Sequence, residues 1–272
     1  MKVMTFNLRF ENDLDAENAW VLRREFVVGT ILKAAPCLLG TQEGTPAQLR
    51  YLQDRLAGYA MHAPGRLWDE TCQYPTLFYR KDRFSVVDGG EFWLSATPEV
   101  HRSKDWDSAF PRMMSQGTFR DMQRDGAIVW VGVTHLDHIG KTARREQAAV
   151  IARRLTSCPG ARILLGDFND GPGSDAHTIL TAPDTGLYDS WQALGREEGK
   201  ESMTFHAFLG TPLICRMDWV LASHSFVVRD AFIVRDHRDG FYPSDHFPYV
   251  VDLEWAGNRS GEPGSSPSSR ME

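Results

Sequence analysis

Residues 161–169 read Ala161-Arg162-Ile163-Leu164-Leu165-Gly166-Asp167-Phe168-Asn169, a short apolar run followed by an acid, an aromatic residue and an amide. The apolar run 161–165 predicts a buried strand, and turn-forming residues follow at 170–173. Because side chains alternate along extended backbone, Asp167 and Asn169 are expected to point to the same side. An acid and an amide at a strand end are typical of a site for general-base chemistry. Asp and Asn also favour turns, so the segment needs matching polar groups elsewhere.

Length and composition indicate an ordinary globular protein. The chain has 272 residues, of which 42% are hydrophobic and 24% charged, which suits one large α/β domain or two small ones. The net charge is −6, from 30 Lys and Arg against 36 Asp and Glu, and no block of basic residues occurs. This charge balance does not indicate non-specific binding to duplex DNA, although it is compatible with a local basic groove.

Cysteine usage and hydropathy bear on the compartment. The four cysteines are scattered, lack the spacing of a zinc site and predict free thiols: Cys37, Cys72, Cys158 and Cys215. No apolar run is long enough to span a bilayer, and the N-terminus lacks the apolar core of a signal peptide. We therefore expect a cytoplasmic protein that binds no membrane. Nothing in the sequence indicates an obligate protein partner.

The order of the predicted elements indicates mixed sheets with helices outside them. Strand patterns cover residues 2–10, 37–41, 76–80, 85–94, 117–122, 127–134, 162–165, 217–222, 225–235 and 249–255. Helical periodicity covers residues 19–35, 46–56 and 142–157, and Ser174 is a suitable N-cap for a further short helix. No internal linker is evident, so residues 1–255 are expected to form a single domain. Residues 256–272 are rich in Gly, Ser and Pro and predict a disordered tail.

Polar side chains recur at the ends of the predicted core strands, where α/β folds build their sites. Those that recur there are Asn7, Glu43, His135, Asp167, Asn169, Asp218, Asp245 and His246. Asp218 is the most unusual, because an acid inside an apolar strand is costly to bury unless it is paired. Converging carboxylates repel one another without a cation, and oxygen ligands suit Mg²⁺ or Mn²⁺ rather than zinc. A hard cation beside an acid and two imidazoles suits phosphoester hydrolysis.

Six short motifs follow one another in the order found in a known family. They are Thr5-Phe6-Asn7, Gln42-Glu43, Thr134-His135-Leu136-Asp137, Gly166-Asp167-Phe168-Asn169, Arg216-Met217-Asp218-Trp219 and Ser244-Asp245-His246. Through them the chain resembles the endonuclease/exonuclease/phosphatase superfamily, the deoxyribonuclease-like metal-dependent phosphoesterases. The resemblance implies an α/β fold, a four-layer α/β sandwich of two mixed, mainly antiparallel sheets packed face to face with helices on the outside. Segments 92–98, 135–138 and 204–206 also resemble a bacterial subgroup of metal-dependent hydrolases.

The resemblance implies a division of labour between metal ligands and catalytic groups. Glu43 is the principal ligand of Mg²⁺ or Mn²⁺, with Asn7 and Asp245 near the metal. Asp167 orients or deprotonates the attacking water, and Asn169 hydrogen-bonds the phosphate or aligns Asp167. His246 contacts a phosphoryl oxygen, and Asp218 fixes its tautomer and raises its basicity. His135 is a second imidazole that contacts phosphate and a candidate general acid.

Four further residues are candidate substrate contacts, with alternatives that the sequence leaves open. Asp137 and His138 extend the motif that contains His135, and His206 lies in another matching segment. His138 and His206 are equally compatible with a substrate contact, a second metal or a structural role. Arg112 suits phosphate oxygens because its guanidinium is a fork of donors, but it is also compatible with a surface loop.

The expected activity is hydrolysis of a phosphodiester or phosphomonoester by direct attack of water. No Ser or Cys lies in a nucleophile-elbow motif such as GxSxG, so a covalent intermediate has no candidate. The acidic balance favours a small phosphorylated molecule or a short nucleic acid, and a DNA or RNA endonuclease or exonuclease is the alternative. A non-catalytic phosphate-binding protein is a remote alternative, because every matched position carries a competent residue. Trp68, Trp93 and Trp106 are candidates to line the pocket or to pack in the core.

Overall fold

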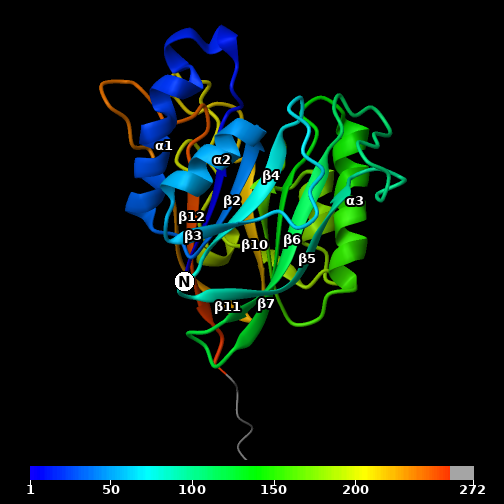
Figure 1. Cartoon of the computed structure of the whole chain (residues 1–272). Coiled ribbons are helices and arrows are strands. Elements are labelled where there is room, and N and C mark those ends of the chain that lie inside the picture. The colour runs from blue at the N-terminus through cyan, green and yellow to red at the C-terminus, as the bar shows by residue number, and fades with distance from the viewer. Residues whose placement is uncertain (258–272) are drawn as a thin grey trace, which may run out of the picture.

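The computed structural model describes residues 1–257, so nearly all of the tail predicted to be disordered, at 256–272, lies outside the described residues. The chain folds into two six-stranded sheets packed face to face, with helices on both outer surfaces (Figure 1). The predicted four-layer α/β sandwich is therefore confirmed. Within residues 1–257, no helix combines the length and the apolar character needed to cross a bilayer.

The first sheet is built around the N-terminal strand. In spatial order it contains β11 (Phe226–Ile233), β12 (Tyr249–Trp255), β1 (Lys2–Asn7), β2 (Leu38–Gly44), β4 (Tyr74–Arg80) and β3 (Tyr59–His62). Only the β1–β2 pair is parallel, and the other pairs are antiparallel. Outside this sheet lie α1 (Trp20–Ala34) and α2 (Pro46–Arg55), labelled on the left of Figure 1. The 3₁₀ turn η1 (Asp13–Asn18) precedes α1.

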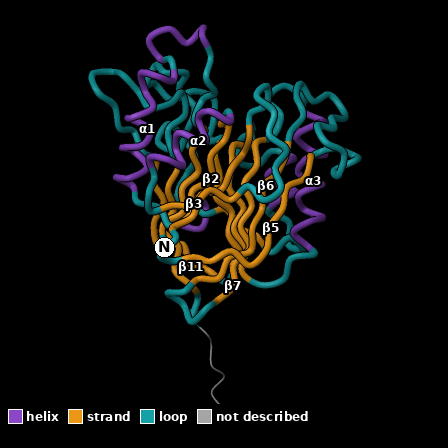
Figure 2. Tube along the Cα trace, viewed as in Figure 1, coloured by secondary structure: helices purple, strands orange, loops and turns teal. Residues whose placement is uncertain are grey.

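The second sheet repeats this plan with one parallel pair. Its spatial order is β5 (Phe84–Trp93), β6 (Met113–Asp121), β7 (Ala127–His135), β8 (Ala161–Asp167), β10 (Asp218–Ser223) and β9 (Leu187–Asp189). β7 and β8 run parallel, and α3 (Lys141–Thr156) connects them. α3 lies on the outer face of this sheet, and the loops gather at one end of the sandwich (Figure 2). The short elements α4 (Asp175–Leu180) and η2 (Gln192–Leu194) complete the chain.

Alternation along buried strands explains the layering. In β1, Val3 faces the core between the sheets, while Met4 and Phe6 face the core under α1 and α2. Both faces of the central strands are thus apolar, which is why they appear in the sequence as continuous hydrophobic runs. Sequence patterning found most elements but missed β3 and β9, which are too short to show a period. It also started β6 at 117, whereas the strand begins at Met113.

Two local features position the loops that carry function. Thr45 caps α2 through a capping box with Gln48, whose amide also holds the carbonyl of Arg9 at 2.9 Å. Gly166 precedes the end of β8, and a Cβ placed there would lie 2.2 Å from the carbonyl oxygen of Thr134. A side chain at this position would push β8 away from β7, so the glycine keeps the two strand ends in register.

Candidate active site

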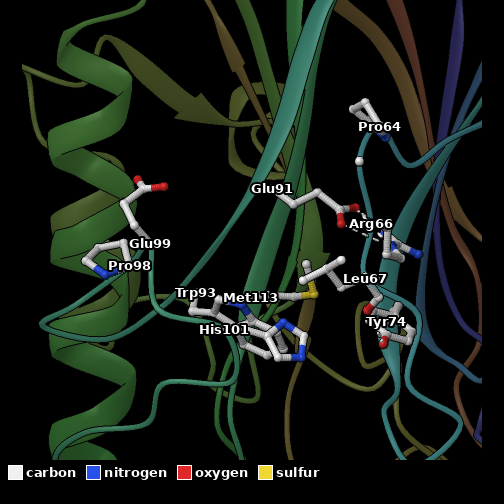
Figure 3. A pocket seen from close by; sticks show the side chains of 11 residues that line it. Pro64, Arg66, Leu67, Tyr74, Glu91, Trp93, Pro98, Glu99, His101 and Met113 are labelled. Atoms are coloured by element: carbon white, nitrogen blue, oxygen red, sulfur yellow. Dashed lines mark hydrogen bonds and ion pairs between the residues drawn. The ribbon is translucent and has the colours of Figure 1, made fainter.

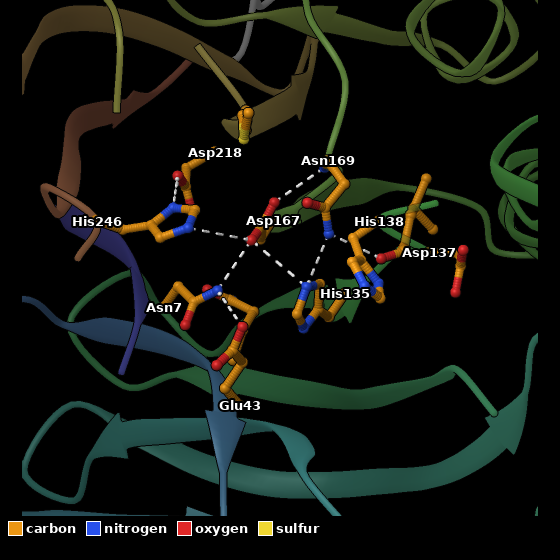
Figure 4. A network of polar contacts seen from close by, with 12 residues as sticks. Asn7, Glu43, His135, Asp137, His138, Asp167, Asn169, Asp218 and His246 are labelled. Carbon is orange, nitrogen blue, oxygen red and sulfur yellow. Dashed lines mark hydrogen bonds and ion pairs between the residues drawn. The ribbon is translucent and has the colours of Figure 1, made fainter. Parts of the chain in front are cut away.

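The polar residues expected at strand ends do converge, at the loop-rich edge of the sandwich (Figure 4). Strand pairing sets Asp167 of β8 opposite His135 of the parallel strand β7 and opposite Asp218 of the antiparallel strand β10. Across the sandwich, Asn7 ends β1, and Glu43 lies on the neighbouring strand β2. The loop between β11 and β12 delivers the remaining two, Asp245 and His246.

Asp167 is the centre of this network. Its Oδ2 accepts a hydrogen bond from the Asn7 amide at 2.9 Å and lies 3.4 Å from Nε2 of His135 and 3.7 Å from Nε2 of His246. The side chain is almost completely buried, at 1% exposed. The dashed lines that meet at this carboxylate in Figure 4 come from residues of both halves of the sandwich. The carboxylate of Asp167 therefore contacts polar residues from both halves of the sandwich.

Burial is also what changes the acidity of this carboxyl. It raises the pKa of Asp167 to about 7, with the nearby charge of Asp218 adding to the effect. The charge of His246 and the hydrogen bond from Asn7 act in the opposite direction. A carboxyl whose pKa lies near neutrality is suited to take a proton at physiological pH.

Asn169 reaches the same site by a turn and not by strand alternation. Its φ is +51°, in the left-handed region, and its backbone N–H donates to Oδ1 of Asp167 at 2.9 Å. The expectation that extended backbone aligns the two side chains is therefore wrong, because the strand ends at Asp167. Asn and Asp are among the residues that tolerate this conformation and bond to their own backbone, which explains why they occur here.

The Asn169 amide fixes the protonation of His135. Its Nδ2 donates to the carbonyl of Leu136 at 3.0 Å and lies 2.9 Å from Nε2 of His135, so that Nε2 acts as the acceptor. The ring is therefore neutral, with its proton on Nδ1. Burial, followed by the positive charge of Arg112, lowers the pKa of His135 well below its ordinary value and supports the same assignment.

His246 has the opposite electrostatic character. Its Nδ1 donates to Oδ2 of Asp218 at 2.8 Å, which leaves Nε2 directed toward Asp167. Burial disfavours the charged ring, but the carboxylates of Asp218 and Asp167 outweigh it and raise the pKa of His246 to about 10. His246 is therefore an imidazolium at neutral pH, held in place by Asp218.

Glu43 and Asp245 add negative charge on the other side of Asn7. Glu43 Oε1 accepts from Nδ2 of Asn7 at 3.2 Å, and its Oε2 accepts from the backbone N–H of Phe10 at 3.0 Å. Glu43 has a φ of +62° and lies where the register of β2 with β4 shifts, so its carboxylate turns toward the site. Burial raises the pKa of Asp245, with Glu43 adding to the effect and His246 opposing it.

The arrangement fits a divalent cation. Asp167, Asp218 and His246 each offer a ligand atom within 4.8 Å of the others, which makes them a candidate metal site. Oδ1 of Asp218 is buried and has no hydrogen-bond partner within residues 1–257. Four carboxylates gather here, and burial, with a neighbouring carboxylate adding to it, raises the pKa values of Asp167 and Asp245. The oxygen donors of Glu43, Asn7 and Asp245 are of the kind that Mg²⁺ and Mn²⁺ prefer.

The network lies at the base of a pocket of about 510 Å³. Alongside the predicted residues, the lining includes side chains that the sequence did not single out: Arg9, Phe10, Gln73, Phe110, Phe205, Ile214 and Met217. The apolar ones come from loops, where hydrophobic periodicity gives no signal. Phe205 and Met217 directly neighbour the recognised positions His206 and Asp218, and Phe110 lies two residues before Arg112, which was the available clue.

Arg112 and His138 form one wall of this pocket. The Nη2 of Arg112 donates to Nδ1 of His138 at 3.1 Å, and the imidazole stacks on Phe110 with ring centroids 5.7 Å apart. Burial lowers the pKa of Arg112. Burial also lowers the pKa of His138, and the charge of Arg112 adds to that shift.

Asp137 and His206 do not fit the substrate contacts predicted for them. Asp137 is buried, and its carboxylate accepts from the backbone N–H groups of Ala109, Ile139 and Gly140, so it organises loops. His206 is also fully buried and stacks on Phe247 at 3.8 Å, outside the pocket lining. Burial lowers the pKa of His206 to about 3. Both side chains are buried by contacts with residues far away in the sequence, which is why the sequence did not indicate these surroundings.

The three tryptophans also lie outside the lining of the candidate site. Trp93 faces a separate cavity of about 160 Å³ near the edge of the second sheet (Figure 3). Arg66 stands on the facing wall, forms an ion pair with Glu91 and donates to the hydroxyl of Thr76 at 2.8 Å. This arginine is satisfied by the protein itself, and Trp68 covers its guanidinium at 4.9 Å.

Comparison with known proteins agrees with the fold. The model of the Endonuclease/Exonuclease/phosphatase family matches residues 4–246. The chain is similar to an endonuclease/exonuclease/phosphatase from Bacteroides vulgatus, at 30% identity and a TM-score of 0.86, covering 94% of this chain and 98% of that one. It is also similar to a mannosyl-6-phosphatase from Bacteroides thetaiotaomicron, at 29% identity and a TM-score of 0.83, with 94% and 100% covered. No curated protein sequence matches the chain.

A more distant structure shares the fold alone. TDP2 of D. rerio, complexed with single strand DNA product, is 16% identical with a TM-score of 0.73, covering 93% of this chain and 98% of that one. The family match extends from β1 to His246 and so includes every predicted metal and catalytic residue. The chain belongs to the endonuclease/exonuclease/phosphatase family, whose members are divalent-metal-dependent hydrolases of phosphoester bonds.

Proposed function

We propose that this protein is a Mg²⁺- or Mn²⁺-dependent phosphoesterase that hydrolyses a phosphomonoester or phosphodiester by direct attack of water. The observation that carries the proposal is the single buried network centred on Asp167. It joins a base of raised pKa, a protonated imidazole and a group of oxygen ligands at the base of one pocket. These are the components that metal-assisted phosphoester hydrolysis requires.

We assign the metal to Glu43, with Asn7 and Asp245 completing its surroundings. The alternative cluster includes His246, whose Nδ1 is already bonded to Asp218 and whose Nε2 carries a proton at neutral pH. Carboxylate and amide oxygens suit a hard cation better than this imidazolium does. A bound cation would polarise the phosphoryl group and neutralise its charge.

The chain's own residues supply the proton transfers. Asp167, held by the N–H of Asn169 and the amide of Asn7, is placed to accept a proton from water. His246 presents its Nε2–H toward the same point and can donate to a phosphoryl oxygen or to the leaving group. We assign the acid role to His246 and not to His135, because Nε2 of His135 accepts from Asn169 and carries no proton to give.

We propose a small phosphorylated molecule as the substrate. The mannosyl-6-phosphatase relative, at 29% identity over nearly the whole chain, supports a phosphorylated small molecule. The pocket of about 510 Å³ has the size of a site for such a ligand. A short nucleic acid is the second candidate, because Phe10, Phe110 and Phe205 line the pocket and can stack on a base.

A metal-dependent hydrolysis screen tests the proposal. The purified protein would be assayed with Mn²⁺, Mg²⁺ or EDTA on p-nitrophenyl phosphate, bis-p-nitrophenyl phosphate, a panel of sugar phosphates and short oligonucleotides. We expect turnover that needs the metal and disappears in Asp167→Asn. Absence of turnover on every phosphoester, or equal rates in the wild type and Asp167→Asn, would show the proposal to be wrong.

A further inference from the structure

The wall formed by Arg112, His138 and Phe110 holds hydrogen-bond donors that the proposed chemistry does not use. Arg112 lines the pocket with its side chain only 10% exposed. Its Nη2 is bonded to His138, and its Nε is enclosed 3.6 Å from Asp137, which is too long for a hydrogen bond. Its Nη1 makes no hydrogen bond with residues 1–257 and is not fully buried. Nη1 is therefore the guanidinium nitrogen that is open to a ligand.

His138 presents a second donor beside the arginine. Because its Nδ1 accepts from Arg112, the neutral ring carries its proton on Nε2. The residue is exposed and lies in the pocket lining. The wall therefore offers two N–H donors and no acceptor of its own. Such a surface selects a ligand group rich in acceptors, and a charged guanidinium favours an anionic one.

Asp137 makes this wall rigid. Its Oδ2 accepts from the N–H groups of Ala109 and Phe110 at 2.9 and 3.3 Å, and its Oδ1 accepts from Gly140 at 2.7 Å. The carboxylate thus ties the loop before Arg112 to the start of α3. Its oxygens are committed to these donors, which is why Arg112 stays unsaturated. The wall is held in position before any ligand arrives, and this reduces the entropy cost of binding.

The wall lies on the side of the site opposite His246, the imidazolium assigned to the scissile phosphate. In Figure 4, His138 lies beyond His135, on the side opposite His246 and Asp218. Arg112 is bonded to His138 and so belongs to this wall, whereas His246 lies on the other side of Asp167. The phosphate that Asp167 and His246 act on has its charge balanced near His246. Arg112 is left to face another part of the substrate.

We propose that Arg112 and His138 bind a second anionic group of the substrate, a carboxylate or a further phosphate one or two bonds from the scissile phosphate. The preferred substrates are then small phosphoesters that carry two acidic groups. Phe110 supplies a flat apolar surface beneath the linking atoms. The inference rests on the proposed function only for where the scissile phosphate binds.

Binding of three non-hydrolysable probes tests this without any turnover. Ethylphosphonate, 2-hydroxyethylphosphonate and phosphonoacetate share a phosphonate and differ in bearing a methyl, a hydroxyl or a carboxylate. Titration calorimetry with excess Mn²⁺ should give phosphonoacetate at least a tenfold tighter Kd than ethylphosphonate. Arg112→Gln should remove that preference and leave ethylphosphonate within about threefold. His138→Phe, which keeps the stacking on Phe110, should weaken phosphonoacetate alone by a smaller factor. Arg229→Gln, at an exposed ion pair on β11, is the control.

Three outcomes would overturn the inference, and none of them depends on catalysis. One is equal binding of phosphonoacetate and ethylphosphonate by the wild type. Another is equal binding of 2-hydroxyethylphosphonate and phosphonoacetate, because the wall would then recognise a neutral hydroxyl. The third is loss of ethylphosphonate binding in Arg112→Gln, which would place Arg112 on the scissile phosphate. Arg112→Lys keeps the charge and serves as a second variant if the glutamine variant does not fold.

Discussion

Two buried histidine–aspartate pairs lie on or beside neighbouring strands of the second sheet, and they have opposite surroundings. The site pair, His246 and Asp218, is joined at 2.8 Å, and the structural pair, His177 and Asp189, at 3.1 Å. Asp218 begins β10, and Asp189 ends β9, which pairs with β10. The chemistry of the two contacts is the same, so any difference in role comes from the groups around them.

The carboxylate of the structural pair is fully partnered, although Nη1 of the neighbouring Arg216 has no hydrogen-bond partner within residues 1–257. Both oxygens of Asp189 face Nη2 of Arg216, at 3.2 and 3.0 Å, and one also accepts from the N–H of Trp191 at 2.8 Å. Burial alone would raise the pKa of Asp189, but His177 and Arg216 outweigh it and lower that pKa. A saturated buried carboxylate of this kind holds elements together and has no capacity for a ligand.

The site pair lacks that saturation. No arginine contacts Asp218 within residues 1–257, its Oδ1 has no partner, and Asp167 adds a further carboxylate 3.7 Å from His246. Burial, with the charge of Asp218 adding to it, raises the pKa of Asp167 to about 7. The comparison teaches that an incomplete buried charge network marks the functional site, whereas a histidine–aspartate pair alone does not.

The largest expected effect comes from removing the base in the incomplete network. Asp167→Asn should lower the rate of phosphoester hydrolysis by about 10³-fold, since positioned acid–base groups contribute roughly 10² to 10⁴. The metal-free variant should fold at least as well as the wild type, because it loses a repelled buried carboxylate. Steady-state kinetics with circular dichroism would measure both. Asp170→Asn, at a neighbouring partly exposed ion pair with Arg144, is the matched control. A variant with near-normal turnover would exclude Asp167 as the base.

The second largest effect should be a loss of stability, and not of activity, when the structural pair of His177 and Asp189 is broken. Asp189→Asn should lower the free energy of unfolding by about 3–5 kcal/mol, because it removes the fully buried one of the two carboxylates that pair with the buried guanidinium of Arg216. Urea unfolding would measure the loss. Asp230→Asn breaks an exposed ion pair with Arg196 and should cost less than about 1 kcal/mol. Equal losses in the two variants would mean that the buried Asp189 network contributes no more to stability than an exposed ion pair does.

The pH dependence of stability should have opposite signs in the two networks. Asp167 has a folded pKa of about 7, above the unfolded value of about 3.9, so its contribution in the metal-free protein is present at low pH and lost as pH rises through 7. Asp189 has a lowered folded pKa, so its contribution is present above about pH 4 and lost as pH falls further. In EDTA, the free energy of unfolding of Asp167→Asn should therefore rise relative to that of the wild type by about 2–4 kcal/mol between pH 4 and 8.

Unfolding curves at four pH values in EDTA would measure that gain. The comparison with the wild type cancels contributions shared by both proteins, including that of the buried His206. A difference that stays constant with pH would mean that Asp167 titrates normally in the folded protein. The Asp189→Asn variant provides the second check, because its deficit should shrink below pH 4 and not above it.

Sequence reasoning located the strands and the members of the site but not how they meet. The long apolar runs gave the central strands, because strands buried on both faces are continuously hydrophobic, whereas the packing of two sheets face to face followed from the family resemblance. Asn169 and Glu43 arrive through left-handed backbone at φ values of +51° and +62°, which no periodicity encodes. Asp137 looked like a substrate contact because its partners, Ala109 and Phe110, come from a distant loop. The roles that failed were those decided by contacts far apart in the sequence.

The smallest expected effect is stabilisation by Mn²⁺, which should depend on the candidate active site and not on the structural pair. Mn²⁺ at about 100 times its Kd should stabilise the wild type by about 2.7 kcal/mol. Glu43→Gln should raise the Mn²⁺ concentration for half-maximal stabilisation by at least roughly 10-fold, since even groups that only support a ligand change affinity by 10–100-fold. The control Glu70→Gln lies at an exposed ion pair with Arg50 and should respond like the wild type. If Glu43→Gln kept its response to Mn²⁺ while Asp218→Asn lost it, the cation would belong to the Asp167, Asp218 and His246 cluster. The site pair would then be completed by metal directly, as the structural pair is completed by Arg216.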